Sequence, residues 1–194
     1  MAVVDILSTG YARMPAAEGG ALHVGSSVTL LRDGDAVVVV DPGMVADRRD
    51  ILDPLAALGA APEDVTDVVF SHHHPDHTLN AALFTNARYH DHMAIYHKDV
   101  WEDREADGYE LTASIRLMRT PGHTAEDIST LVTTESGLVV LTHLWWTGEG
   151  PADDPFAPDR GQLRASRRLV LDLAPDLVIP GHGPAFRPGQ STPE

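Results

Sequence analysis

Residues 71–77 read "SHHHPDH", so four histidines and one aspartate fall within seven positions. The apolar run "VTDVVF" (65–70) comes directly before them and predicts a buried strand that leads into the histidines. Side chains two apart in an extended segment project to the same side, which groups His72 with His74 and turns His73 away. The segment is either a chance cluster in a solvated loop or a loop built to hold metal.

The spacing His-x-His-x-Asp-His favours a metal site. Asp76 and His77 are expected to open a helix on the turn that follows His74. The segment can therefore offer ligands in two directions, which suits two adjacent cations. Because the chain contains no cysteine, any metal must be held by histidine and carboxylate side chains, and no disulfide can form.

Two later histidines and one earlier aspartate also follow apolar runs. His123 lies in "TPGHT" and His182 lies in "IPGHG", where Pro-Gly provides a tight turn after a predicted strand. Asp41 ends the run "VVVVDPG". Loops on a rigid scaffold are where catalytic side chains gather, so these residues are further candidates for the site.

Predicted strands and helices alternate along the chain and indicate an α/β architecture with the helices outside. The run 27–43 predicts a hairpin around an Asp-Gly turn. Further strands are expected at 87–92, 114–120, 128–134, 137–142 and 177–180, and helices at 45–61, 76–84 and 159–176. We expect residues 1–194 to form a single domain whose tail frays from about Pro188.

The quoted motifs resemble those of the metallo-β-lactamase superfamily. "SHHHPDH", "TPGHT" and "IPGHG" match, in order, its His-x-His-x-Asp-His signature and its two later histidines, and "VVVVDPG" resembles its early strand-end aspartate. The resemblance runs from about Val28 to Pro184. The short chain and its "GHGPAF" segment are similar to small stand-alone members, especially the metallo-β-lactamase domain-containing protein 1 subgroup. It implies a four-layer αββα sandwich with a metal site at one edge of the two sheets.

The resemblance also implies two divalent metal ions and a set of ligands. It assigns the first metal to His72, His74 and His123, and the second to Asp76, His77 and His182. It gives Asp41 the role of orienting a ligand histidine from behind. Zinc is the default metal for nitrogen and oxygen donors, while iron and manganese can use the same donors.

One position departs from the superfamily pattern. Most dinuclear members carry a bridging aspartate after the strand that follows His123, but "LVVLTHLWW" has His143 at that place. An imidazole cannot bridge two cations through one oxygen, and the missing negative charge weakens attraction for the second cation. His143 is therefore interpreted as a seventh ligand or as a proton carrier beside the site.

A metal ion lowers the pKa of bound water to about 7, so the predicted reaction is hydrolysis by metal-activated water. Asp76 is the natural residue to orient that water and to accept its proton, and no serine or cysteine nucleophile is required. A degenerate member that binds metal without turnover is the non-enzymatic alternative, because His143 replaces the usual carboxylate.

The charge of the chain bears on the substrate. Lys and Arg number 14 against 29 Asp and Glu, which gives a formal net charge of −15. Such a chain repels polyanions unless a local patch reverses the sign. The only basic cluster is interpreted as a solvated helix face and comprises Arg160, Arg164, Arg167 and Arg168. We therefore expect a small ester, thioester or lactone substrate and no nucleic acid partner. A phosphodiesterase or ribonuclease is the alternative, because the resembled subgroup includes RNA-cleaving members.

Two further segments are candidates for the substrate pocket. Trp145 and Trp146 follow His143 directly, and alternation along an extended chain predicts that one of them faces the site. The segment 10–22 is expected to be a loop that closes over the pocket. Tryptophan also suits a subunit contact, which leaves a homodimer open.

Composition also predicts where the protein resides. The sequence has no run of 18 apolar residues that would span a membrane. Its first residues do not combine a basic region, an apolar stretch and a cleavage site. The expectation is a cytoplasmic protein without a membrane partner.

Overall fold

The computed structural model describes residues 1–15 and 19–194, and over these ranges the strands form two large sheets and a separate hairpin. The first sheet has seven strands in the described ranges, in the order β1 (Val3–Ser8), β4 (Val28–Asp33), β5 (Ala36–Val40), β6 (Asp67–Val69), β7 (Arg88–His90), β8 (Ala94–His97) and β9 (Val100–Asp103). In the second sheet the order is β10 (Ile115–Arg119), β11 (Ile128–Thr134), β12 (Gly137–Thr142) and β13 (Leu177–Pro180).

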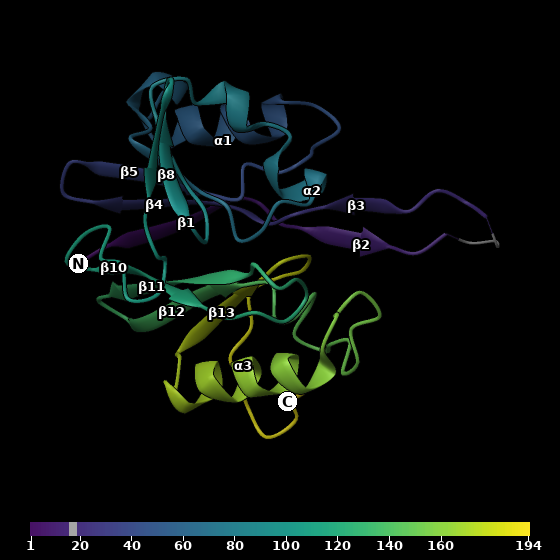
Figure 1. The fold of residues 1–194 in the computed structure, drawn as a ribbon. Helices are drawn as coiled ribbons and strands as arrows, with labels where there is room; N and C mark the ends of the chain where they lie inside the picture. Colours follow the sequence, from purple (N-terminus) through teal and green to yellow (C-terminus); the bar gives the residue numbers. More distant parts are fainter. Residues whose placement is uncertain (16–18) are drawn as a thin grey trace.

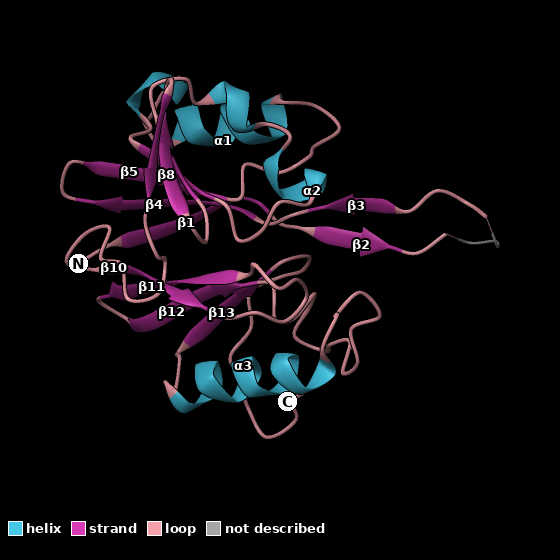
Figure 2. Ribbon diagram, in the orientation of Figure 1, coloured by secondary structure: helices cyan, strands magenta, loops and turns pink. Residues whose placement is uncertain are grey.

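Helices cover the outer faces of both sheets. The helix α1 (Arg49–Ala57) lies against the first sheet, and α3 (Arg160–Asp172) lies against the second. The short helix α2 (Pro75–Thr78) lies to one side, close to the strand β3 (His23–Gly25). Short 3₁₀ turns occur at Pro62–Asp64 and Ala81–Leu83. Figure 1 shows the resulting order of layers, with α1 above, the two sheets in the middle and α3 below, and Figure 2 shows the same layers by element type. The predicted αββα sandwich is confirmed.

The alternation of side chains along the strands explains the layers. In β5, Val38 and Val40 point into the core between the sheets, while Val39 packs under α1. A third buried cluster, which includes Trp145 and Leu163, fills the space between the second sheet and α3. Strands that are apolar on both faces are expected where helices and a second sheet cover them.

The ends of parallel strands create the edge where the histidines lie. β5 and β6 are parallel, and so are β12 and β13, so each pair delivers its carboxyl ends to one edge of its sheet. Backbone hydrogen bonds join the two sheets there, from Ser27 N to Gly181 O at 2.8 Å and from Ile128 N to Ser71 O at 2.9 Å. The loops that follow the strands therefore meet at a fixed place.

The helices are shorter than the sequence predicts. The helix expected over 45–61 begins at Arg49, whose backbone N–H donates to the Asp47 carboxylate. The helix expected over 76–84 ends at Thr78, because the chain turns there and continues in a 3₁₀ segment. Strands β1, β8 and β9 are not predicted from the sequence, because their residues do not alternate strictly between polar and apolar.

The C-terminal tail corrects another expectation. It was expected to fray from about Pro188, but the structure places it against the rest of the chain, where the indole N–H of Trp145 donates to Pro193 O at 2.8 Å and Arg168 pairs with Glu194 at 2.9 Å. No helix within the described ranges is long and apolar enough to cross a membrane.

Arg167 is a buried cation that holds the loop between β12 and α3. It was expected on a solvated helix face, but its side chain is fully buried and donates to three backbone carbonyls. The acceptors lie at 2.7–2.9 Å and are Leu144 O, Pro151 O and Ala152 O. The remaining members of the basic cluster are exposed, and Arg160 and Arg164 both pair with Asp153.

Replacing Arg167 is expected to destabilise the protein more than replacing its exposed neighbour. Arg167→Met would leave three carbonyls without their charged donor, and we expect the free energy of unfolding to fall by about 2–4 kcal/mol. Arg164→Met removes only an exposed pair at 3.2 Å and should change it by less than about 0.5 kcal/mol. Urea denaturation followed by circular dichroism measures both; equal effects would contradict the assigned role of Arg167.

Candidate metal centre

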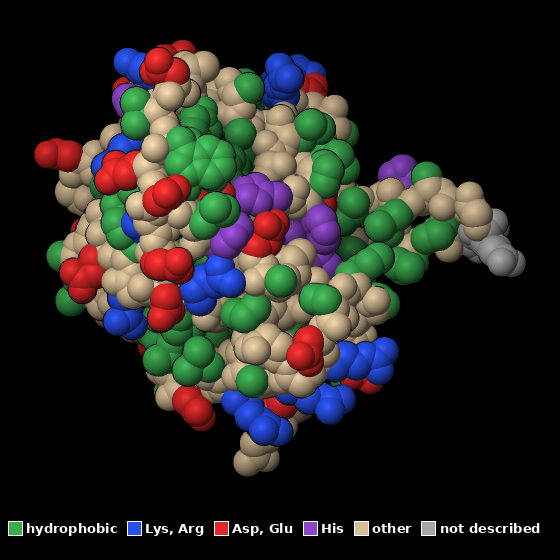
Figure 3. Space-filling view, in the orientation of Figure 1, with side chains coloured by type: hydrophobic (Ala, Val, Ile, Leu, Met, Phe, Trp, Pro, Cys, Tyr) green, Lys and Arg blue, Asp and Glu red, His purple; other side chains and the backbone are tan. Residues whose placement is uncertain are grey.

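Loops from both sheets bring the expected metal-binding side chains together. Figure 3 shows histidines gathered with an acidic side chain near the centre of one face of the molecule. Neighbouring donor atoms in this cluster lie within 4.8 Å of one another in several overlapping groups of three. The residues brought together are His72, His74, Asp76, His77, His123, His143 and His182.

The three residues assigned to the first metal converge on one point. His74 Nδ1 lies 3.0 Å from His72 Nε2 and 3.0 Å from His123 Nε2. Nitrogens bound tetrahedrally at about 2.0–2.1 Å from one zinc ion lie roughly 3.3 Å apart, so the observed spacing is close to that of a zinc site. The donor set therefore fits a single divalent cation.

A second group lies on the other side of the loop. Asp76 Oδ2 is 3.5 Å from His77 Nε2 and 3.6 Å from His182 Nε2. His77 Nε2 is buried and has no hydrogen-bond partner among the described residues. A buried polar atom without a partner is rare in proteins, and this nitrogen is near a carboxylate, so the two groups suit the binding of a cation.

His143 lies between the two groups. Its ring centroid is 4.1 Å from that of His123 and 4.8 Å from that of His182. Its Nε2 atom is 2.9 Å from His182 Nε2, and its Nδ1 atom is buried with no partner in the described ranges. Gly181 makes room for the ring, because a Cβ atom at that position would lie 2.4 Å from His143 Cδ2. His143 therefore lies inside the cluster, with donor atoms close to those of His72, His77 and His123.

Asp41 holds the histidine loop from behind. The residue has a positive φ of 51°, which turns the chain sharply after β5. One carboxylate oxygen accepts from the backbone N–H of Ser71 at 2.7 Å, and the other accepts from His77 Nδ1 at 2.8 Å. The second bond leaves His77 Nε2 directed toward Asp76. This contact is the one that the resemblance implies for Asp41.

Two more buried aspartates contact the histidines of the cluster, and neither is predicted from the sequence. Asp154 accepts from His123 Nδ1 at 2.7 Å, and Asp127 lies 3.9 Å from His72 Nδ1. Burial raises the pKa of Asp127 to about 6. Asp127 is close to the "TPGHT" motif and could have been suspected, whereas Asp154 lies 31 residues beyond His123 without a local signal.

The histidines are held mainly in the neutral form that binds metal. Burial lowers the pKa of His72 and His143 well below the usual range and lowers that of His182 to about 4. Burial acts in the same direction on His77, but the Asp41 carboxylate outweighs it and raises the pKa of His77.

An apolar cavity of about 190 Å³ opens directly beside the cluster. Among the described residues, none of those that line it is lysine or arginine. The rings of Trp146 and Phe156 are stacked on one side, with centroids 5.7 Å apart and an interplanar angle of 17°. The complete lining is Ala12, Leu22, Val24, His74, Asp76, His123, Trp146, Phe156 and His182.

The cavity corrects the expectation of a loop over 10–22. Part of that segment is the strand β2 (Tyr11–Arg13), which pairs with β3 (His23–Gly25) in a hairpin that projects beyond the sheets. Ala12 and Val24 of this hairpin form a wall of the cavity. Residues 16–18 of the expected loop lie outside the described ranges.

The two adjacent tryptophans face in opposite directions. Trp146 lines the cavity, as expected for one of the pair. Trp145 does not: it is fully buried in the cluster between the second sheet and α3, and its ring packs near Phe186. Of the two candidates for the pocket, Trp145 is therefore the one that does not line it, which agrees with the expectation that alternation sends the two rings to opposite faces.

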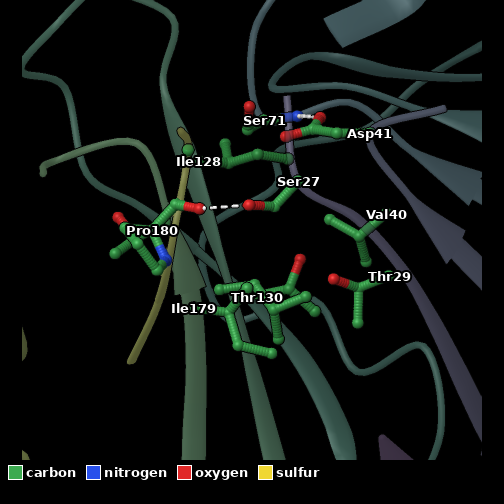
Figure 4. A pocket seen from close by; sticks show the side chains of 12 residues that line it. Ser27, Thr29, Val40, Asp41, Ser71, Ile128, Thr130, Ile179 and Pro180 are labelled. Atoms are coloured by element: carbon green, nitrogen blue, oxygen red, sulfur yellow. Dashed lines mark hydrogen bonds between the residues drawn. The ribbon is translucent and has the colours of Figure 1, made fainter. Parts of the chain in front are cut away.

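A second, much smaller cavity lies between the sheets behind the cluster (Figure 4). Ser71 and Asp41 lie at one end and Thr130 and Ile179 at the other. Its volume of about 10 Å³ is that of a single water molecule. This cavity is therefore too small to hold a substrate.

Comparisons with known proteins agree with this arrangement. A model of the metallo-beta-lactamase superfamily matches residues 23–182. A Xenopus laevis protein named metallo-beta-lactamase domain-containing protein 1 is 34% identical over 197 residues, covering 95% of this chain and 81% of that protein. The chain spans less of the human protein of that name, 64%.

Two other similarities extend the comparison. A Bacillus cereus protein named N-acyl homoserine lactonase is 32% identical over 164 residues, covering 73% of this chain and 64% of that protein. A solved structure from Thermotoga maritima shares the fold with a TM-score of 0.74 at 22% identity, covering 96% of this chain and 99% of that one. The resemblance stated from the motifs is confirmed, and the chain belongs to the metallo-β-lactamase superfamily of metallohydrolases.

Proposed function

We propose that the protein hydrolyses a small uncharged ester, thioester or lactone that carries an apolar group. The observation that carries this proposal is the apolar cavity of about 190 Å³ beside the histidine cluster. Ligand cavities are typically apolar with a few polar groups that fix orientation. Here the polar groups all belong to the cluster, and the remaining walls are aliphatic or aromatic.

The proposed metal ligands are those that the superfamily pattern assigns. His72, His74 and His123 would hold one ion, and Asp76, His77 and His182 would hold the other. His143 would act as an additional ligand between them, because its ring lies within 4.8 Å of the rings of both His123 and His182. Zinc suits the donor set best. A divalent cation held there would supply Lewis-acid stabilisation of the developing oxyanion and an activated water at neutral pH.

The side chains of the chain itself have distinct proposed roles. Asp76 would orient the attacking water and accept its proton, since its carboxylate faces both His77 and His182 at 3.5–3.6 Å. Trp146 and Phe156 would hold the apolar group of the substrate against their stacked rings. Asp41 would keep His77 directed at the site through its 2.8 Å hydrogen bond.

One named relative and the charge distribution support an acyl substrate over a phosphodiester. A relative that aligns with 73% of the chain is named an N-acyl homoserine lactonase. A phosphodiesterase needs cations that contact the phosphate backbone. Arg160 and Arg164 are instead paired with Asp153, and Arg168 is paired with Glu194.

Removal of metal is expected to abolish hydrolysis, and loss of the Asp76 carboxylate to reduce it strongly. We expect Asp76→Asn to lower kcat for p-nitrophenyl acetate by about 10²–10⁴-fold, because a general base is lost. Zinc added after chelation should restore the wild type but not the variant. The exposed variant Asp53→Asn is the matched control and should keep wild-type activity. Faster turnover of bis-p-nitrophenyl phosphate than of the ester would contradict the substrate assignment.

Shortening the aromatic wall should affect long acyl groups selectively. Each buried methylene contributes about 0.8 kcal/mol, so a hexanoyl ester gains more from the wall than an acetyl ester. We expect Phe156→Ser to raise KM for p-nitrophenyl hexanoate about threefold to tenfold and for the acetate less than about twofold. Trp101→Ser, at an equally exposed aromatic residue on β9, is the control. A uniform loss with both esters would argue against an acyl subsite at Phe156.

A further inference from the structure

We propose that Asp154 is a positioning residue that joins the metal-binding histidine His123 to the aromatic wall of the cavity. One carboxylate would then set the orientation of a metal ligand and the shape of the substrate subsite together. The proposal rests on the metal-binding part of the proposed function and not on the identity of the substrate.

The hydrogen bonds of Asp154 carry the inference. Oδ2 accepts from His123 Nδ1 at 2.7 Å and from the indole N–H of Trp146 at 2.9 Å. Oδ1 accepts from the backbone N–H of Phe156 at 2.9 Å. The side chain is only 1% exposed, so water does not compete for these bonds. Three donors therefore end on one carboxylate: the ring N–H of His123, the indole N–H of Trp146 and the backbone N–H of Phe156.

The rings themselves are in contact, which links their orientations. His123 packs edge-on against Trp146, with centroids 6.1 Å apart, and against Phe156, with centroids 5.9 Å apart. A rotation of the His123 ring about its side-chain bonds would move its N–H away from Asp154 Oδ2, which the Trp146 indole shares. Orientation of the ligand and orientation of the wall are thus coupled through a shared acceptor.

The backbone of the same loop is fixed by a different residue. Arg167 donates to Pro151 O at 2.8 Å and to Ala152 O at 2.7 Å, just before Asp154. The loop therefore has an anchor that does not involve His123 or Trp146. Asp154 acts beyond that anchor, on the rings, so its loss is expected to change ring positions more than the path of the chain.

The chemistry of an amide makes Asp154→Asn a sharp substitution. A carboxylate accepts at both oxygens, whereas asparagine has one oxygen and one NH₂ group. If the amide oxygen faces His123 and Trp146, the NH₂ group faces the Phe156 N–H, and two donors then meet. If the amide is flipped, its NH₂ group faces the two ring donors instead. The variant keeps the size of the side chain and cannot satisfy all three donors.

The test combines zinc affinity with intrinsic fluorescence in the purified protein of residues 1–194. Zinc affinity is measured by competition with a chromophoric chelator, and tryptophan emission is followed during the same titration. Outer hydrogen-bond partners of metal ligands typically change affinity 10–100-fold, and we expect Asp154→Asn to weaken zinc binding by about that factor. Zinc should change the emission of the wild type, and the change should be absent in Asp154→Asn.

Two further variants separate coupling from a general structural effect. Trp146→Phe should bind zinc within about twofold of the wild type while losing the zinc-induced change in emission, because it keeps the His123–Asp154 bond and removes the reporter. Asp153→Asn is the matched control in the same loop, since Asp153 pairs only with exposed arginines, and it should behave as the wild type in both measurements.

Several outcomes would overturn the proposal. Wild-type zinc affinity and an unchanged emission response in Asp154→Asn would show that the carboxylate positions neither group. If Asp154→Asn does not fold, an emission change that persists in Trp146→Phe still refutes the coupling. If coupling is observed but no ester is hydrolysed, the substrate assignment fails and the role of Asp154 stands.

Discussion

The histidine cluster is governed by one physical requirement: buried nitrogen atoms need bonding partners. The described residues do not supply a partner for all of them. Imidazole nitrogens face one another at about 3 Å, and the buried atoms His77 Nε2 and His143 Nδ1 lack partners in the described ranges. Each unsatisfied buried polar atom costs about 1–3 kcal/mol. Under the proposed function, cations at the centre remove this cost, and the edge where the two sheets meet depends on them.

Neighbouring groups hold three of the imidazole rings through the ring nitrogen that faces away from the centre of the cluster. Asp41 holds His77, Asp154 holds His123, and Gly25 O accepts from His182 Nδ1 at 3.1 Å. These partners come from the turn after β5, the loop after β12 and the hairpin β2–β3, so separate parts of the fold converge on the rings. A site built in this way is preorganised, because ring orientations are set by bonds that do not involve the ligand position.

The sequence predicts the parts of this centre that are local. Apolar runs that end in "SHHHPDH" or "IPGHG" place ligand histidines at strand ends, because strand and loop are contiguous in the chain. The contact between Asp154 and His123 and the burial of Arg167 both depend on how the loop after β12 folds back. No short sequence pattern predicts that fold of the loop. Trp145 and Trp146 are predicted only in part. Alternation predicts that the two rings lie on opposite faces, but tertiary packing decides which ring faces the site.

The most direct test of the central claim is the number of divalent ions bound by the protein purified without added metal, measured by mass spectrometry of the metals. Two ions per chain, both removed by a chelator, are expected if His143 completes the second site in place of a carboxylate. One ion would contradict that role for His143. A folded chain that holds none, even after incubation with zinc, would contradict the metal centre itself.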